Sequence, residues 1–405
     1  MEARRVRKGA SERLGAVDGD LVVEHNGRVD VDGRLVVSGE LRCEGTAEFS
    51  GAVECRSLRL EDGPTTVRGD LLVRDRVEGH DSSLEVTGAL SAGTVDVDRR
   101  LRISGAAKAE GFEVGGSLEG GSTMTADRVA VGGRLVLAGK LVARNVEAGG
   151  AADLAEVELD KLEVGGLASV RGGAVRSSIE VGGRFRSTAP LVFGSLEVGG
   201  LASVAAGSKG GDVEVGGKFS ADGDIIFGKL EVGGLGSIAG NGTGQRVEVG
   251  GKLDVQGSLK IDGPTEVGGS IVVGGSFDGA GLGVGGRLEA RRAVLTGKAE
   301  VGGRVATREG LKAGELRLGR KAEATGPLVG RDVRIGVKAK VEDVFGQRVE
   351  LDDLAEARRV VGEHVRLGDG TTVDSVVYSG TLELGRNARS RTAPQKVETL
   401  PAFPI

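Results

Sequence analysis

The chain has 405 residues, of which 74 are glycine and 7 are proline, and its formal net charge at neutral pH is −5. Aromatic residues make up only 2%, and acidic and basic residues are interspersed, which argues against binding of nucleic acid and against aromatic platforms for sugars. No stretch is apolar for long enough to predict a transmembrane helix.

Residues 1–15 (MEARRVRKGASERLG) are expected to form a basic tail before the repeats begin. No apolar stretch follows the basic residues, so we expect no signal peptide. A solvated tail is the usual state of such a terminus, whereas Arg4, Arg5, Arg7 and Lys8 leave contact with anionic lipid or an acidic partner open. A short helix over SERLG that caps the end of the fold is the other alternative.

Apolar residues alternate with polar ones from Leu21 onward, in runs of four or five that Gly, Asn-Gly or Asp-Gly interrupts. Period two with glycine punctuation predicts short strands joined by tight turns. An apolar residue followed two positions later by glycine recurs at steps of 17 to 19 residues, at Val31, Phe49, Val67, Val86 and Ile103.

The most regular part of the chain is residues 161–249, where LEVGG, IEVGG and VEVGG recur. The valines before the Gly-Gly pairs lie at steps of seventeen residues and are Val164, Val181, Val198, Val215, Val232 and Val249. Alternate copies match best, which adds a super-period of thirty-four. A repeat this short cannot bury an apolar face alone and must stack on its neighbours.

The period continues after Gly-Gly is lost, at Leu318, Ile335, Leu351, Leu367 and Leu384. LDDLAEARRVV would suit a helix in isolation, but its place in the repeat predicts another coil. At Val114 and Val273 the apolar-glycine marker shifts its position within the repeat. These shifts indicate that each coil has three sides of five or six residues. We therefore predict an all-β, single-stranded parallel β-helix (a β-solenoid), continuous over residues 16–392, triangular, and with about 21 coils of 16–18 residues.

Residues 393–405 leave the repeat and are expected to form an apolar, proline-punctuated tail, in which Phe403 is a candidate contact residue. Within the repeat, the valine of each Val-Gly-Gly should point inward. The glycines should form the corners, where the lack of Cβ permits positive φ and close stacking of backbones. These corner glycines are Gly165, Gly182, Gly199, Gly216, Gly233 and Gly250.

Four positions after the marker valine, large and small residues alternate between coils, as with Phe185 and Phe219 against Ala168, Ala202 and Gly236. Large over small in successive layers fills a narrow core without voids. The residue before the marker is acidic in six successive coils, from Glu163 to Glu248, and predicts an outward ladder of like charges. The cations three positions after the marker, such as Arg184, Lys218 and Lys252, are expected to screen it.

The intervening coils carry leucine at this plus-three position, namely Leu167, Leu201 and Leu235. If they face outward they form an apolar stripe, and such stripes are often contact surfaces. The alternative is that they turn inward where alanine or glycine has left room. We predict the outward stripe.

Residues for catalysis or ligand binding are not grouped in the sequence. The histidines His25, His80 and His364 are dispersed, and Cys43 and Cys55 have no metal-ligand spacing and favour a reduced compartment. No motif for a nucleophile, a metal or a phosphate is present. Coils of this length leave no room for the loops of polysaccharide lyases, and no histidine-bearing arm of an acyltransferase is visible. We expect no enzyme, no cofactor and no metal site.

The stretches GDLVVEHNGRVDVDGRLVVSGEL, VRIGVKAKVEDVFG and VRLGDGTTVDSVVYSGTLELG resemble the bactofilins, the polymer-forming cytoskeletal family. The resemblance implies a right-handed, three-sided β-helix that stacks end to end into filaments without nucleotide, often at a membrane. The helix expected here is longer than the short domain usual in that family.

The expected function is therefore a non-catalytic cytoskeletal scaffold that self-assembles end to end. Its expected partner is itself, with a membrane surface or other scaffold proteins at the termini left open, and its expected location is the cytoplasm. One alternative is a monomeric spacer or cell-surface display protein of the adhesin type. The other is an enzyme resembling the hexapeptide-repeat acyltransferases.

Overall fold

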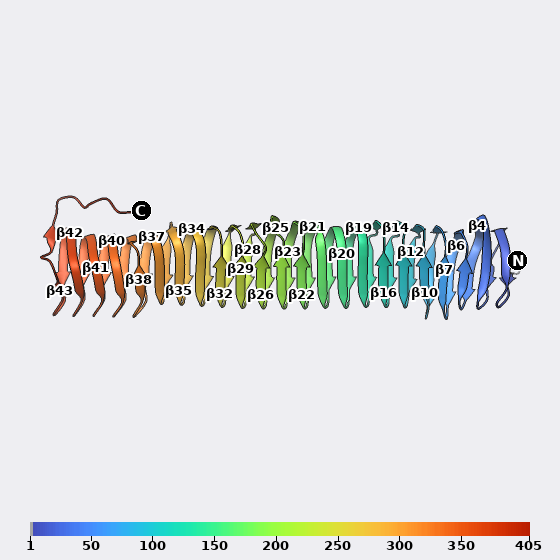
Figure 1. Cartoon of the computed structure of the whole chain (residues 1–405), viewed down its shortest axis with the longest axis horizontal. Helices are drawn as coiled ribbons and strands as arrows, with labels where there is room; N and C mark the ends of the chain where they lie inside the picture. The colour runs from blue at the N-terminus through green and yellow to red at the C-terminus, as the bar shows by residue number, and fades with distance from the viewer. Residues whose placement is uncertain (1–2) are drawn as a thin grey trace. The chain divides into compact units, whose positions relative to one another are not determined.

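The computed structural model describes residues 3–405, which form 44 strands and no helix. Every strand pair is parallel, and the fold is the predicted β-solenoid, with about 23 turns against the 21 expected. The chain divides into two compact units, Met1–Gly200 and Leu201–Ile405, which are described separately. Figure 1 shows how successive strands stack within each unit.

The strands of the first unit are β1 (Arg4–Val6), β2 (Ser11–Val17), β3 (Leu21–Val23), β4 (Gly27–Glu44), β5 (Ala47–Phe49), β6 (Ala52–Glu61), β7 (Pro64–Val67), β8 (Leu71–Val73), β9 (Arg76–His80), β10 (Ser83–Val86), β11 (Leu90–Ser91), β12 (Thr94–Val97), β13 (Arg100–Ile103), β14 (Ala107–Lys108), β15 (Gly111–Val114), β16 (Ser117–Gly120), β17 (Met124–Thr125), β18 (Arg128–Val131), β19 (Arg134–Ala148), β20 (Ala151–Val164), β21 (Leu167–Val181), β22 (Arg184–Ser187) and β23 (Leu191–Val198).

Those of the second unit are β24 (Leu201–Val204), β25 (Ser208–Val215), β26 (Lys218–Ala221), β27 (Ile225–Ile226), β28 (Lys229–Val232), β29 (Leu235–Ile238), β30 (Gly242–Gly244), β31 (Arg246–Val249), β32 (Lys252–Val255), β33 (Leu259–Val267), β34 (Ser270–Val284), β35 (Arg287–Leu295), β36 (Lys298–Val301), β37 (Arg304–Leu318), β38 (Glu323–Thr325), β39 (Leu328–Ile335), β40 (Lys340–Leu351), β41 (Glu356–Leu367), β42 (Thr372–Leu384), β43 (Arg389–Ser390) and β44 (Gln395–Lys396).

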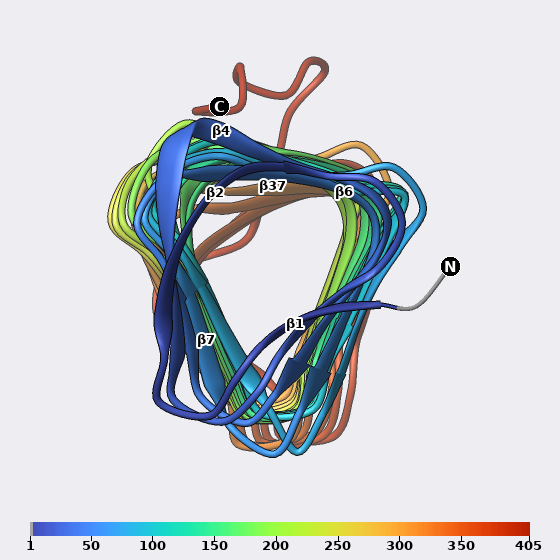
Figure 2. The same cartoon turned by 90° about the vertical axis from the view of Figure 1, so that its right-hand side faces the viewer.

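Where the strands are short, three of them make one coil, because each pairs with the third strand before it and the third strand after it. In the first unit β10 pairs with β7 and β13, β11 with β8 and β14, and β12 with β9 and β15. In the second unit β26, β29 and β32 form one such ladder. Seen along their axis the coils are three-sided, as predicted (Figure 2). Smooth corners join sides into long strands, as in β19, which pairs with β16, β17 and β18.

Residues 4–17 differ from the expected tail, because they already form strands of the first coil. Arg4–Val6 pairs with Leu21–Val23, and SERLG lies in the strand Ser11–Val17, which pairs with β4, rather than in a helix. The apolar residues of this coil are buried, since Val6 is 0% and Leu14 is 3% exposed. The other ambiguous segment, LDDLAEARRVV, contributes to strand β41 as the repeat predicted.

The core alternates large and small side chains in successive coils, as predicted. Phe219 is fully buried between Ala202 and Gly236, its partners in register on either side, and Phe185 lies opposite Ala168. A narrow core can hold a phenyl ring only where the next layer is small.

The Gly-Gly corners are explained by close stacking and not by positive φ, which corrects half of the expectation. None of the six predicted corner glycines has positive φ. A Cβ on Gly165, Gly182, Gly199, Gly233 or Gly250 would instead lie well under 3.0 Å from the carbonyl oxygen of the glycine one coil earlier. Each corner therefore stacks backbone directly on backbone.

The last coils of the second unit turn their corners differently. Here a residue with positive φ forms the corner, and its N–H donates to a carbonyl of the next coil, as Lys338 N does to Asp353 O at 3.0 Å. The following residue is small and buried, such as Ala339 at 0% exposure. The corner residues in successive coils are Lys321, Lys338, Leu354, Gly370 and Asn387.

Candidate functional surfaces

The described residues 3–405 hold no group of three or more His, Cys, Asp and Glu side chains arranged to bind a metal. His25, His80 and His364 are exposed and lie in different coils. Cys43 and Cys55 are free thiols in the core, and burial raises the pKa of each to about 12. Both thiols are therefore protonated and unreactive at neutral pH while the coils stay closed.

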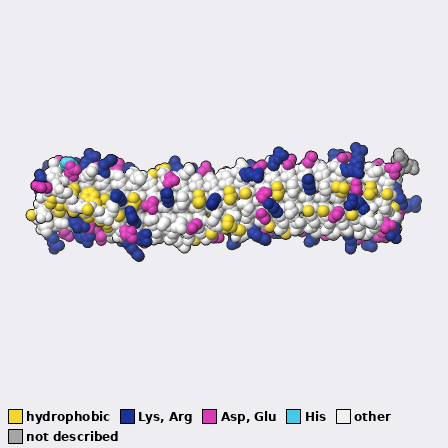
Figure 3. Space-filling model, turned by 90° about the horizontal axis from the view of Figure 1, so that it is seen from above, with side chains coloured by type: hydrophobic (Ala, Val, Ile, Leu, Met, Phe, Trp, Pro, Cys, Tyr) yellow, Lys and Arg dark blue, Asp and Glu magenta, His cyan; other side chains and the backbone are white. Residues whose placement is uncertain are grey.

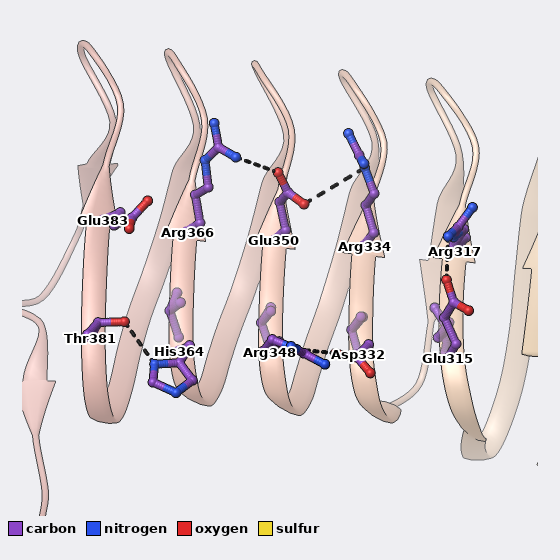
Figure 4. Close-up of a pocket in the computed structure, with 14 residues that line it drawn as sticks. Glu315, Arg317, Asp332, Arg334, Arg348, Glu350, His364, Arg366, Thr381 and Glu383 are labelled. Atoms are coloured by element: carbon purple, nitrogen blue, oxygen red, sulfur yellow. Dashed lines mark hydrogen bonds and ion pairs between the residues drawn. The ribbon is translucent and has the colours of Figure 1, made fainter.

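A charged surface covers one side of strands β37, β39, β40, β41 and β42, over a hollow of about 540 Å³. Figure 4 shows two parallel rows of side chains across these coils. In one row Arg366 donates to Glu350 at 3.0 Å, and in the other Arg348 pairs with Asp332. The rows are Glu315, Asp332, Arg348, His364 and Thr381, and Arg317, Arg334, Glu350, Arg366 and Glu383.

Positive and negative groups on this surface compensate one another. The hydrogen bond that Arg348 donates lowers the pKa of Asp332, and the hydrogen bond that Arg334 donates to Asp352 raises the pKa of Arg334. Exposed ion pairs of this kind add little stability. With its charges paired internally, the surface has no excess of either sign for an ionic ligand.

The predicted ladder of outward glutamates is present, but its partners are not the predicted ones. Glu163 and Glu180 are neighbours in register, and Lys161 bridges them at 3.3 and 3.0 Å. In the second unit Lys229 pairs with Glu231 and Arg246 with Glu248 in the same way. In these three strands the screening cation lies two residues before the glutamate, because side chains two apart point to the same face.

The three leucines of the predicted stripe face outward, with exposures of 57% for Leu167, 41% for Leu201 and 50% for Leu235. Each alternates with a cation in register: Leu167 with Arg184 in the first unit, and Leu201 and Leu235 with Lys218 in the second. Each leucine is therefore an isolated apolar side chain with a charged side chain in the neighbouring coil. Their role as a contact surface stays a prediction.

A continuous apolar ladder exists elsewhere in the second unit, on the outward side of β39 to β42. Val329, Phe345, Val361 and Val377 are partners in register in four successive coils. The chain returns along them after β44, so that Leu400, Phe403 and Ile405 pack on the ladder. Figure 3 shows hydrophobic side chains gathered at this end, where the tail lies in Figure 1.

Aromatic and charged contacts hold the tail near its last residues. The rings of Phe403 and Phe345 lie 5.7 Å apart between centroids, and the guanidinium of Arg359 lies 5.0 Å from the Phe345 centroid. Arg359 and Arg358 donate to Asp343, the latter through two nitrogens at 2.9 and 2.8 Å. Burial raises the pKa of Asp343, but these guanidinium groups outweigh it and hold the pKa below its ordinary value.

The last coil leaves part of the core uncovered, since the tail turns to the side. Leu382 and Leu384 continue the columns of Val365 and Leu367. The latter two are 2% and 1% exposed, whereas Leu384 is 56% exposed. Among residues 3–405, no strand pairs with the far edge of β42 at these leucines.

The first coil is closed by charge. Arg4 occupies the register position over Leu21, and Glu12 that over Val29, both of which are buried core residues. The two charged groups come from different sides of the coil and lie 3.5 Å apart. An ion pair thus takes the place that the apolar side chains of Leu21 and Val29 hold in the next coil.

Sequence reasoning found the corner glycines, the outward leucines and Phe403, but not what Phe403 contacts. The signal was present, because Leu328-Val329, Val344-Phe345 and Val360-Val361 are apolar pairs that interrupt the alternation. The second member of such a pair must face outward. The Arg4–Glu12 pair gave no comparable signal.

No segment of the described chain forms a helix with the length and apolarity that crossing a membrane requires. Comparison with protein-family models, with curated proteins and with solved structures gave no match to this chain.

Proposed function

We propose that this protein is a non-catalytic structural scaffold, bactofilin-like in kind, whose solenoid self-associates end to end without nucleotide. One observation carries the proposal: the last coil leaves Leu384 exposed and Leu382 half-buried, although both continue buried columns of the core. An open core end and an unpaired strand edge favour association with a matching surface.

The difference between the first and last coils favours one geometry of contact. The first coil presents the Arg4–Glu12 pair, whose burial against an apolar surface would cost desolvation. The last coil presents leucines. Two last coils related by a two-fold axis would bury four leucines and would pair the edges of β42 in antiparallel orientation.

The test is the oligomeric state of the full chain with Leu384→Glu. A glutamate in the contact would bury an unpaired charge, so we expect sedimentation equilibrium to show a dimer for the natural sequence and at least about tenfold weaker association for the variant. Leu354→Glu is the matched control, because Leu354 is 50% exposed but lies at a corner away from the end. It should leave the dissociation constant unchanged.

Negative-stain electron microscopy of the same samples distinguishes the larger assemblies. Pairs joined at one end are expected, and filaments would show that the first coil also takes part. A monodisperse monomer at high concentration, or a dimer unaffected by Leu384→Glu, would refute the proposal.

The second candidate is a monomeric spacer or display protein. The Arg4–Glu12 pair favours it, since burying these charges against another solenoid would cost desolvation. A chain that stays monomeric, and that cell fractionation places at the cell surface, would support this alternative.

A further inference from the structure

The ladder under the tail is unlike the same outward row elsewhere in the second unit. Across earlier coils this row runs Lys209, Ile226, Thr243, Lys260 and Asp278, so that no two large apolar residues are adjacent. Under the tail it becomes Val329, Phe345, Val361 and Val377, bounded by Lys312 on one side and Gln395 on the other. The apolar ladder therefore coincides with the strip that the tail covers.

The tail is what buries this ladder. Val329, Phe345 and Val361 point away from the core, yet they are only 4%, 3% and 1% exposed. Leu400, Phe403 and Ile405 of the tail pack against them. Without the tail, these outward side chains would form one of the largest exposed apolar patches of the second unit.

Within the tail, β44 (Gln395–Lys396) pairs with β42, and the residues after it are held mainly by side chains. From residue 397 onward it forms no strand. The hydrogen bonds that tie it to the coils are Val397 N to Tyr378 O at 2.9 Å and Lys312 Nζ to Ile405 O at 2.8 Å. The tail can therefore leave without opening any coil, since the strands beneath keep their own ladders.

The fit between tail and ladder is specific. Phe403 packs on one part of the Phe345 ring while Arg359 lies over the ring at 5.0 Å. Gly310, with φ of +121°, provides room for Ile405, because a Cβ there would meet Ile405 Cδ1. The ladder is thus a strip that fits one extended segment, the sequence LPAFPI, and we call this strip the tail groove.

We propose that this groove is a binding site for an extended apolar segment, and that its occupant in trans is the tail of a second copy of this chain. A second copy's tail makes the same contacts as the first, so exchange joins two solenoids side by side at little net cost. The tethered tail competes at high effective concentration, so exchange is favoured where copies are crowded or where one tail is displaced.

The experiment mixes two complementary full-length variants, both carrying Leu384→Glu so that the end contact does not contribute. The donor has Phe345→Asp, which spoils its own groove and frees its tail. The acceptor has Leu400→Asp and Phe403→Asp, which undock its tail and leave its groove empty. We expect a 1:1 complex by sedimentation velocity at micromolar concentrations, with each variant alone remaining monomeric.

A matched control adds Phe403→Asp to the donor and should abolish the complex. A synthetic peptide of residues 393–405 should bind the acceptor and not the donor, and should compete with the donor for the acceptor. Far-UV circular dichroism of each variant verifies that the coils are intact.

Three results would overturn the proposal. The first is no complex between donor and acceptor together with no binding of the peptide to the acceptor. The second is a complex that survives Phe403→Asp in the donor. The third is an acceptor that dimerises alone, which would show that two bare ladders meet directly. None of these results bears on the end contact, which Leu384→Glu removes from all samples.

Discussion

The second unit contains coils with two kinds of corner. In the Gly-Gly coils, a carbonyl of the previous coil occupies the space that a Cβ at Gly233 or Gly250 would need. In the coils with left-handed corners, Lys321, Lys338 and Leu354 carry full side chains, and all three are exposed. The first kind stacks backbone on backbone and permits no side chain.

The left-handed corner carries a local backbone cost of about 1 kcal/mol but leaves its side chain in solvent. The comparison shows that corner glycines are needed for packing between coils in the Gly-Gly region. They are dispensable in the region with left-handed corners. The coils that tolerate side chains at their corners also carry the tail groove and the exposed end. Both regions keep the same period, so the two kinds of corner use the same number of residues per coil.

The largest expected effect tests how the two regions fill their cores. Phe219→Ala should lower the free energy of unfolding by about 3–5 kcal/mol, because Ala202 and Gly236 on either side are too small to fill the cavity. Leu351→Ala, flanked by Ile335 and Leu367, is the matched variant and should cost less. Urea unfolding followed by circular dichroism measures both. Equal losses would show that layering of large and small residues is not what sets the cost.

The corners themselves can be compared directly. Gly233→Ala should destabilise by about 2–4 kcal/mol, because its Cβ would collide with the carbonyl of Gly216. Lys338→Gly should change stability by no more than about 1 kcal/mol, because glycine relieves the positive φ but loosens the unfolded chain. Hydrogen exchange at the amides of neighbouring coils localises each effect. A harmless Gly233→Ala would remove the distinction between the corners.

The smallest expected effect is on acid stability in the left-handed region. The folded-state pKa of Asp343 is held below its unfolded value, so its contribution is complete above about pH 4 and is lost as pH falls through the folded pKa. Asp343→Asn should cost about 1–3 kcal/mol at pH 7 and should flatten the decline in stability below pH 4. Stability measured from pH 7 down to pH 2 tests this, with Asp254→Asn, in a Gly-Gly coil, as the comparison. An unchanged acid slope would contradict the role of Asp343.

Most of the fold could be predicted because every coil of a solenoid is built by the same local interactions. The seventeen-residue step, the three sides and the alternation of Phe219 with Ala202 all follow from a local rule that every coil obeys. The corner glycines were also found, although their reason was close stacking rather than positive φ. In a periodic sequence, each repeat is a separate piece of evidence for the structure of the same coil.

The features that were missed are those that occur once. Residues 4–17 lack clear alternation, so their strands could not be separated from a basic tail. The contact between Phe345 and Phe403 joins positions far apart in sequence, and no period connects them. The cation that pairs with each glutamate depends on side-chain reach, which spacing alone does not determine.

The closed first coil and the open last coil also agree with the direction in which a ribosome makes the chain. Synthesis is slow compared with strand pairing, so each coil can wind onto its predecessor as it emerges. The Arg4–Glu12 pair covers the core of the first coil as soon as that coil has formed. From then on, only the growing end exposes apolar core residues. Leu382 and Leu384 show the apolar residues that such a growing end exposes.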